Sequence, residues 1–329
     1  MAPGASASLG PVGAQPHVAT VVLSWNGRDD TLECLASLER MRWEPHTAIL
    51  VDNGSTDGTT EAVRERFPEA VVIRSEENLG FAEGNNVGIR AALDAGADYV
   101  LILNNDTIVD EGLIAALVEE AERRPDAGAL CPLIRYVDPP DRIWYAGARF
   151  DPRAIHNGRH TGYGERDAGQ YHAVREIGRA TGAAMLVPRR VIEEVGYFDR
   201  ELFIQVEDVE WSLRMRAAGY RILFVPSGVL WHHVAVASGG ERAPETAYYE
   251  MRNTLVVSAR HSPLPRLRHL WRELGILAVH LFHARLAPRP LENARGVIAG
   301  WRAYRAGRLG RRGTGGAQPV LPRGDAARA

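Results

Sequence analysis

The sequence predicts an α/β fold with a mostly parallel central sheet flanked by helices. Apolar runs of strand length alternate with helix-like segments from residue 18 to residue 123, and this order favours parallel strands joined by right-handed crossovers. Two of the strand-like runs lead directly into polar residues, at Asp52 and at Asn104. Because α/β proteins bind ligands at the carboxyl edge of the sheet, these strand ends predict a binding site.

The elements of the first half follow from hydrophobic periodicity and turn residues. The continuous β-branched run that begins at Val18 predicts a buried strand, and a turn of Ser, Asp and Gly before Thr59 predicts the start of a helix. Strands are expected at residues 18–24, 47–51, 70–74 and 99–103. Helices are expected at residues 31–41, 59–67, 85–95 and 111–123.

The second half is less regular. Residues 138–170 are rich in Gly, Pro and Asp, which predicts loops and short antiparallel strands. Strands are expected again at residues 183–188 and 221–225, and helices at residues 189–195 and 208–218. Beyond Pro263 the pattern becomes helical and basic, and the last residues, from Gly313, have the composition of a disordered tail.

Charge is distributed unevenly along the 329 residues. The net charge is −2, yet the segment from Arg260 onward holds 14 Arg and three acidic residues, a balance of +11 that leaves −13 for the rest. An acidic globular part with a basic tail predicts an anionic surface as the partner of the tail. No nucleic-acid partner is expected.

The compartment is inferred from cysteines and from apolar runs. Cys34 and Cys131 lack metal-ligand spacing and are expected to be free, buried thiols in a reducing compartment. Residues 1–16 lack the basic start and apolar block of a signal peptide, and the apolar run at 274–282 is too short to cross a bilayer. We therefore expect a cytoplasmic protein, with peripheral contact to the inner face of the membrane as an open alternative.

The segment that follows the fourth expected strand carries oxygen ligands. Asn104, Asn105 and Asp106 stand where the apolar run ends. Carboxylate and amide oxygens suit Mg²⁺ or Mn²⁺ holding a diphosphate. The plainer interpretation is a strand followed by a polar turn.

The second expected strand leads into VDNGSTDGT at residues 51–59. Asp52 leaves the strand at the ligand edge and could accept the N3–H of a pyrimidine base, and Asn26 ends the neighbouring SWN segment. Ser, Thr and Asp in this turn are equally typical of helix capping.

The Gly- and Asn-rich segment at residues 77–89 superficially resembles a dinucleotide-binding fingerprint. Gly80, Gly84 and Gly88 are however spaced four apart and follow the third strand, which argues against a dehydrogenase. A loop that packs Asn78 and Asn85 against a nucleotide sugar fits the pattern better.

Candidate catalytic and phosphate-binding residues follow in the second half. Three acids, Glu207, Asp208 and Glu210, stand close together: they are typical of a solvated helix start, but their apolar neighbours could also raise a carboxyl pKa and produce a base. His232 is weak evidence alone, yet with Asp106 it could complete a Mn²⁺ site. Arg252 is available for phosphate.

Nine motifs follow one another between about Val18 and Ala259. They are SWN, VDNGSTDGT, NLGFAEGNN, LILNNDT, TGAAMLV, GYFD, EDVEWSLR, WHH and YYEMRN. In this order they resemble glycosyltransferase family 2 and especially its bacterial rhamnosyltransferase-like members. The resemblance implies a GT-A fold, a nucleotide-diphospho-sugar donor, a divalent metal, either Mg²⁺ or Mn²⁺, and inversion at the anomeric carbon.

The resemblance also implies site roles. Asp52 would bind the donor base and Asn26 would line the nucleotide pocket. Asp106 would bind the metal as the last acid of the DxD motif, and Asn104 replaces its first acid with a neutral ligand. Asp208 would be the catalytic base, and His232 would ligate the metal.

The expected domain organisation has four parts. Residues 17–259 would form the GT-A domain, with a nucleotide-sugar-binding half at 17–110 and an acceptor-binding half at 111–259. Residues 260–312 would form a basic helical extension, between disordered ends at 1–16 and 313–329.

The leading functional hypothesis is an inverting glycosyltransferase that uses dTDP-L-rhamnose and a glycan or lipid-linked acceptor in cell-surface polysaccharide or glycolipid synthesis. Alternatives are a UDP-sugar donor or a non-catalytic scaffold. A nucleotidyltransferase would need a phosphate-binding loop rich in Arg or Lys near the first strand. This reaction is disfavoured because that region has only Arg28.

The basic extension contains apolar residues at helical spacing, which predicts one apolar helix face. The two interpretations are a helix packed on the domain and an interfacial helix on anionic lipid. The residues of this face are Leu267, Leu270, Trp271, Leu274, Leu277, Ala278 and Leu281.

Overall fold

The computed structural model describes residues 15–150, 160–234, 243–261 and 265–313. The ends expected to be disordered, 1–16 and 313–329, lie outside these ranges except for Gln15, Pro16 and Gly313. Part of the loop region expected at 138–170 also lies outside them.

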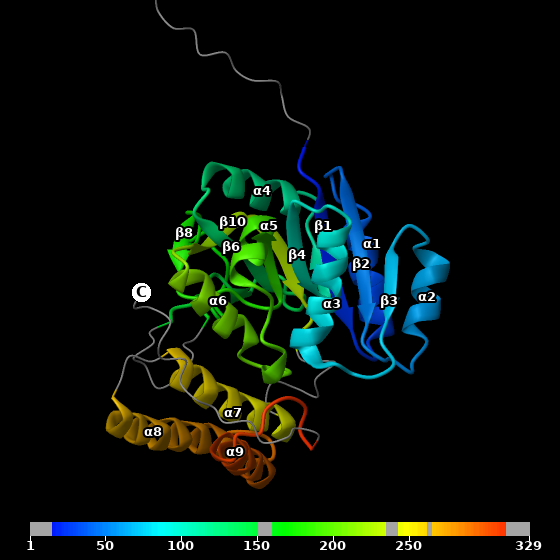
Figure 1. The fold of residues 1–329 in the computed structure, drawn as a ribbon. Helices are drawn as coiled ribbons and strands as arrows, with labels where there is room; N and C mark the ends of the chain where they lie inside the picture. Colours follow the sequence, from blue (N-terminus) through cyan, green and yellow to red (C-terminus); the bar gives the residue numbers. More distant parts are fainter. Residues whose placement is uncertain (1–14, 151–159, 235–242, 262–264, 314–329) are drawn as a thin grey trace, which may run out of the picture.

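One mixed sheet forms the centre of the described structure (Figure 1). Its strand order is β3-β2-β1-β4-β9-β6-β10-β5, with β7 paired to β6 and β8 paired to β10. The strands are β1 (Val18–Ser24), β2 (His46–Asp52), β3 (Val71–Arg74), β4 (Tyr99–Asn104), β5 (Thr107–Val109), β6 (Ala127–Tyr136), β7 (Ile143–Tyr145), β8 (Arg175–Ile177), β9 (Ala184–Pro188) and β10 (Arg221–His232).

The expected parallel pairing holds from β3 through β4. Strand β1 lies between β2 and β4, and its register places Ser24 opposite Asp52 and Leu23 opposite Asn104. The polar strand ends therefore meet at one carboxyl edge, as the sequence predicts. Beyond β4 the sheet becomes mixed, because β9 runs antiparallel to both β4 and β6.

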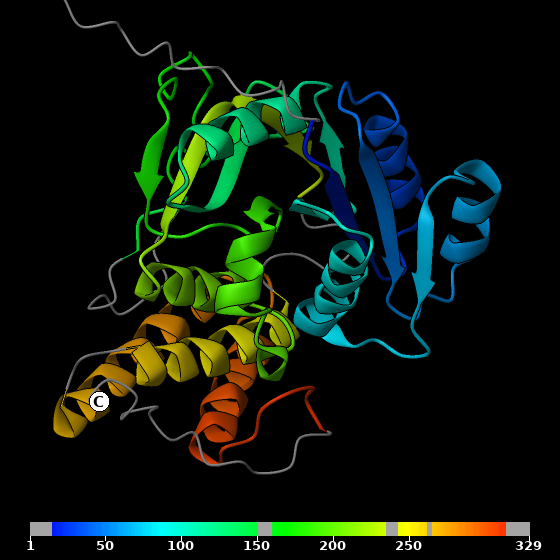
Figure 2. The same ribbon diagram turned by 45° about the horizontal axis from the view of Figure 1, so that its top comes forward.

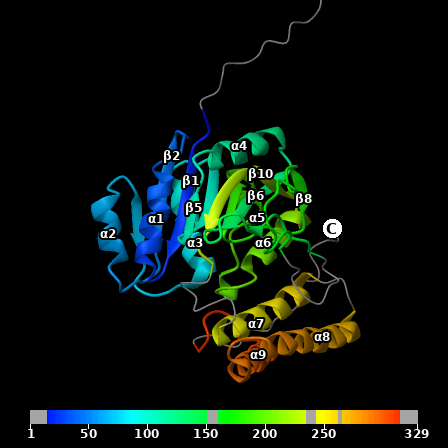
Figure 3. The ribbon, with the colours of Figure 1, turned by 180° about the vertical axis from the view of Figure 1, so that it is seen from behind.

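Helices cover both faces of the sheet. Helix α3 lies on one face and α1 on the other, as the front and back views show (Figures 1 and 3). The helices before residue 220 are α1 (Arg28–Leu38), α2 (Thr59–Arg66), α3 (Gly80–Asp94), α4 (Leu113–Arg123), α5 (Arg189–Val195) and α6 (Glu207–Ala217), with a 3₁₀ turn η1 (Arg200–Leu202).

Helix α3 begins five residues earlier than the expected 85–95, so most of the Gly- and Asn-rich segment is helical rather than a loop. Gly80 makes the turn with a φ of 83°. Gly84 and Gly88 face β1, where an added Cβ would collide with Leu23 or Val21. These glycines allow the helix to approach the strand closely.

Strand β10 extends to His232 instead of ending near residue 225. Its register against β6 shifts between Val225 and Val229, where Pro226 and Gly228 interrupt regular pairing. After this irregularity β10 pairs antiparallel with β5, opposite Thr107. The longer strand brings His232 beside the end of β4.

Helices α7 (Pro244–His261), α8 (Arg266–Arg285) and α9 (Pro290–Arg305) pack against one another (Figure 2). Helix α7, which the expected boundary at residue 260 assigns to the GT-A part, thus packs with the helices of the basic extension. The unit lies beyond the edge at which β1 ends (Figures 1 and 3). Within the described residues, no helix is both long and apolar enough to cross a membrane.

The single apolar face expected on α8 is divided in two. Ile276 and Ala284 are buried, and Leu277 and Leu281 pack beside them against α7 and α9. The same buried side holds Glu273, which accepts a hydrogen bond from the indole of Trp301 at 2.6 Å. Four large apolar side chains of α8 are exposed, at 46% for Leu270, 71% for Trp271, 44% for Leu274 and 59% for Phe282. The side chain of Leu267, also expected on this face, lies outside the described part of the structure.

Candidate active site

The ends of β1 and β2 are tied together by side chains expected to contact the donor. Asp52 is fully buried, and its oxygens accept hydrogen bonds from the Ser55 amide at 2.8 Å and from the Thr60 hydroxyl. Asn26 is exposed, and its Oδ1 accepts a hydrogen bond from the Thr56 amide at 2.8 Å. Asp52 thus shapes the turn after β2, and Asn26 remains exposed at this edge of the sheet.

The turn before α3 is organised by two asparagines. The Nδ2 of Asn53 donates to Asn78 Oδ1 at 3.1 Å, and Asn53 Oδ1 accepts from the Leu79 amide at 2.9 Å. We call residues 77–80 the donor turn. Asn85, in the second turn of α3, is fully buried and donates to the Phe81 carbonyl at 2.9 Å, while its Oδ1 has no hydrogen-bond partner.

Asp106 and His232 form a buried pair where β4 and β10 end. Asp106 Oδ1 lies 3.0 Å from His232 Nε2, and the two residues are 9% and 6% exposed. The other imidazole nitrogen of His232, Nδ1, has no hydrogen-bond partner, and the ring packs edge-on against Trp144 with centroids 4.7 Å apart. The structure brings these two predicted ligands together.

Asn104 and Asn105 are neighbours at the end of β4 but lie in different surroundings. Asn104 is the last residue of β4 and is partly exposed beside Asp106. Asn105 turns the other way, and its Nδ2 donates to Thr31 Oγ1 at 3.0 Å and to the Gly27 carbonyl at 3.3 Å. Asn105 therefore ties β4 to the start of α1.

The Asp106 and His232 pair fits a divalent metal ion. Adjacent ligands at about 2.1 Å from an octahedral ion are about 3 Å apart, which is the separation of the two side-chain atoms here. A mixed imidazole and carboxylate pair suits Mn²⁺ better than Mg²⁺, which prefers oxygen. Across the described ranges, no cluster of three or more His, Cys, Asp or Glu residues could hold a metal. Donor oxygens and water would have to complete the coordination.

Asp208 lies in the first turn of α6, next to the start of β9. Its Oδ2 accepts a hydrogen bond from the Gly182 amide at 3.0 Å and is 3.9 Å from the Arg179 guanidinium. The next residue, Ala183, accepts a hydrogen bond from the Asn104 amide at 3.0 Å. Asp208 and Asn104, the last residue of β4, thus contact the consecutive residues Gly182 and Ala183.

Glu207 is buried beside Asp208, and its Oε2 has no hydrogen-bond partner. Burial, together with the Asp208 charge, raises the pKa of Glu207 to about 8. Burial therefore favours the protonated form of Glu207. Asp208 is the more accessible of the two carboxyl groups, with 17% of its side chain exposed.

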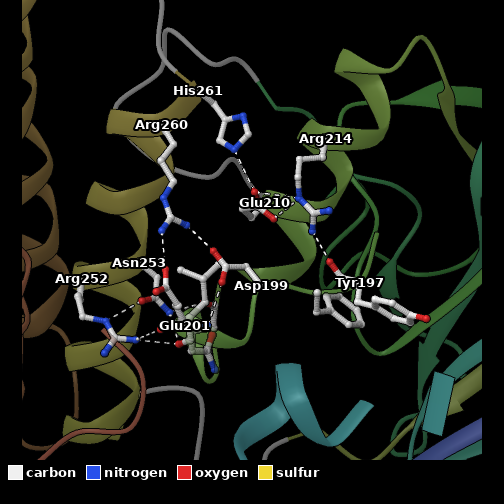
Figure 4. Close-up of polar contacts among 12 residues, drawn as sticks. Tyr197, Asp199, Glu201, Glu210, Arg214, Arg252, Asn253, Arg260 and His261 are labelled. Carbon is white, nitrogen blue, oxygen red and sulfur yellow. Dashed lines mark hydrogen bonds and ion pairs between the residues drawn. The ribbon is translucent and has the colours of Figure 1, made fainter. Parts of the chain in front are cut away.

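The expectation that Arg252 is available for phosphate is wrong in this structure. Arg252 is fully buried, and its guanidinium donates to Asn253 Oδ1 and to the carbonyls of Glu201, Leu202 and Gly310 (Figure 4). Its N–H groups are used within the protein, because α7 packs directly on the loop that precedes α6.

Three residues of this region were not recognised from the sequence. Asn53 stands in the VDNGSTDGT motif, where its position directly after Asp52 was a usable signal. Asn253 ends the YYEMRN motif, directly after Arg252, which was likewise a usable signal. Arg179 gave no comparable signal, because its partner Asp208 lies about 30 residues away in the chain.

Comparison with known proteins connects this arrangement to a family. The model of glycosyl transferase family 2 matches residues 20–196. The N-acetylglucosaminyl-diphospho-decaprenol L-rhamnosyltransferase of Mycobacterium tuberculosis is 34% identical over 264 residues, which cover 74% of this chain and 85% of that protein.

Two solved structures share the fold. A mannosyltransferase of Pyrobaculum calidifontis in complex with GDP-Man and Mn²⁺ has a TM-score of 0.56 at 17% identity, covering 88% of this chain and 87% of the other. TarS 1–349 of S. aureus in complex with UDP-GlcNAc has a TM-score of 0.54 at 14% identity, covering 93% and 99%. These similarities confirm the expected GT-A architecture.

Proposed function

The chain belongs to glycosyltransferase family 2, and we propose that it transfers L-rhamnose from dTDP-L-rhamnose, with inversion, to a lipid-linked acceptor. The observation that carries the proposal is the placement of Asp208 and of the Asp106 and His232 pair at one edge of the sheet. The mycobacterial relative, an N-acetylglucosaminyl-diphospho-decaprenol L-rhamnosyltransferase, supports the choice of donor sugar and acceptor class.

In the proposed reaction Asp208 is the base. Its carboxylate accepts the proton of an acceptor hydroxyl while that oxygen bonds to the anomeric carbon from the face opposite the diphosphate. The bond between the anomeric carbon and the diphosphate oxygen breaks, and the electron pair leaves with the diphosphate. The Gly182 amide and Arg179 fix the carboxylate in position.

The leaving diphosphate would lie at Asp106 and His232. A divalent ion bound there would neutralise part of the developing charge. Asn104 would face the same ion or the diphosphate from the end of β4. The base and ribose of the donor would lie over the ends of β1 and β2, near Asn26 and the donor turn.

The test is a donor and acceptor panel with purified protein. We expect nucleoside diphosphate release from dTDP-L-rhamnose with Mn²⁺ and a polyprenyl diphosphate-linked N-acetylglucosamine acceptor. Faster turnover with a UDP-sugar would replace the donor assignment. Failure to turn over any donor, despite nucleotide binding, would favour the scaffold alternative.

We further propose that the exposed face of α8 binds an anionic membrane. Trp271, Leu274 and Phe282 line this face, and the exposed Arg268 and Arg285 stand at its two ends. Apolar insertion combined with basic residues is typical of interfacial helices. The helical unit lies on the side of the sheet where β1 and β2 end, so a lipid-linked acceptor would be near the site (Figure 1).

A further inference from the structure

The loop at residues 202–206, which we call the bridging loop, has an unfavourable backbone conformation. Phe203, Gln205 and Val206 have φ values of 65°, 71° and 73°. Residues with side chains rarely adopt this left-handed region, and β-branched Val is especially unfavourable there. Surrounding contacts must therefore hold the loop in place.

Asn253 on α7 supplies three of these contacts. It is fully buried, and its Nδ2 faces the bridging loop (Figure 4). The nitrogen donates to the backbone oxygens of Leu202, Ile204 and Gln205 at 2.9, 2.9 and 2.7 Å. One side chain thus satisfies the carbonyls that the unusual backbone turns toward α7.

Arg252 orients that amide and adds contacts of its own. Its Nε donates to Asn253 Oδ1 at 2.8 Å, which fixes the amide with its nitrogen toward the loop. Its Nη2 donates to the Leu202 carbonyl at 2.8 Å, and its Nη1 donates to the Gly310 carbonyl at 2.6 Å. The Gly310 amide in turn donates to the Glu201 carbonyl at 2.6 Å.

The bridging loop contacts both halves of the site. The Phe203 carbonyl accepts a hydrogen bond from the Ala82 amide in the first turn of α3 at 3.0 Å. An added Cβ at Gly80 would lie 2.5 Å from the same oxygen, so the donor turn and the loop are in close contact. At the other end, Val206 is the N-cap of α6 and directly precedes Glu207 and Asp208.

We propose that Arg252 and Asn253 are positioning residues for sugar transfer: by holding the bridging loop, they set the separation between the donor turn and Asp208. The proposal rests on the proposed function, because it takes Asp208 as the base. A small displacement of a reacting group reduces the rate strongly, so the effect should fall on the chemical step.

The test compares Asn253→Ala and Arg252→Lys with the control Arg260→Ala. Arg260 also connects α7 to this segment, through the side chains of Asp199 and Glu201 and not through the loop carbonyls. We expect kcat to fall about 10²-fold in the two test variants. The donor Kd should change less than about threefold, since Asn53 and Asn78 organise the donor turn independently. The control should keep kcat within about threefold.

Hydrogen exchange provides a readout that does not depend on activity. The amides of Ala82 and Glu210, which bond to the Phe203 and Val206 carbonyls, should exchange faster in Asn253→Ala and not in Arg260→Ala. Unchanged exchange at both amides, a wild-type kcat in Asn253→Ala, or an equal loss of kcat in Arg260→Ala would overturn the proposal. If wild-type protein turned over no donor, the proposed function would fail, and the exchange data would still decide whether Asn253 holds the loop.

Discussion

The Nε2 atom of His232 lies 3.0 Å from the Asp106 carboxylate, although the two residues are 126 positions apart in the chain. The antiparallel pairing of β5 with β10 creates this contact, because it places His232 opposite Thr107, the residue after Asp106. The geometry joins a hard oxygen and an imidazole at the distance of two adjacent metal ligands. It also makes the metal hypothesis testable at two independent positions.

Asp208→Asn is expected to lower kcat by about 10²–10⁴-fold, because the amide cannot accept the acceptor proton. Donor binding should remain near wild type, since the substitution preserves size and lies away from β1 and β2. Steady-state kinetics and calorimetry with the nucleoside diphosphate measure the two effects. A variant that kept more than about a tenth of the turnover would exclude Asp208 as the base.

Asp106→Ala and His232→Ala are each expected to weaken Mn²⁺-dependent donor binding by at least about tenfold. Each removes one of the two buried protein ligands proposed for the ion. Asn104→Asp is the matched opposite change and should tighten Mn²⁺ binding by adding a charged oxygen. Titration of donor with and without chelator measures these effects. A donor affinity that changes neither with chelator nor in Asp106→Ala would exclude metal dependence.

Glu207→Gln is expected to flatten the pH dependence of stability. Because the pKa of Glu207 is raised in the folded protein, the stability that this group contributes to the folded state is fully present below the unfolded pKa of about 4.3. That stability is lost as the pH rises toward about 8. Between pH 5 and pH 8 the variant should therefore lose less unfolding free energy than wild type, by on the order of 1 kcal/mol or more. Urea denaturation at both pH values measures this difference. The exposed Glu119→Gln is the control, and equal slopes for all three proteins would contradict the assignment.

Trp271→Glu combined with Phe282→Glu is expected to release the protein from anionic liposomes. Both side chains are exposed on α8, so the fold should tolerate the change. Val71→Glu is the matched control, because Val71 is 44% exposed on the distant edge strand β3. Cosedimentation with anionic and neutral vesicles at rising salt measures binding. Wild-type protein that sediments equally with both vesicles, or with neither, would leave α8 only its packing role.

The sequence by itself determined the strand and helix order of the first half and the edge at which the site forms. Apolar runs such as 99–103 and the polar residues directly after them are local signals, and parallel pairing follows from their alternation with helices. The motifs also determined the family, because their order and spacing are properties of the sequence alone. The start of α3 was missed because glycines at 80, 84 and 88 argue locally against a helix, while close packing on β1 favours one.

Only the tertiary structure decided which polar side chains stay accessible and which hold the protein together. Arg252 and Asp52 have the residue types of a binding site, yet each is fully buried and hydrogen-bonded within the protein. The division of α8 into a buried face and an exposed apolar face likewise depended on where α7 and α9 pack. A sequence pattern reports the chemistry a side chain can perform. Burial and partners far apart in the chain decide whether that chemistry remains free for a ligand, because a buried polar group must first satisfy its own hydrogen bonds.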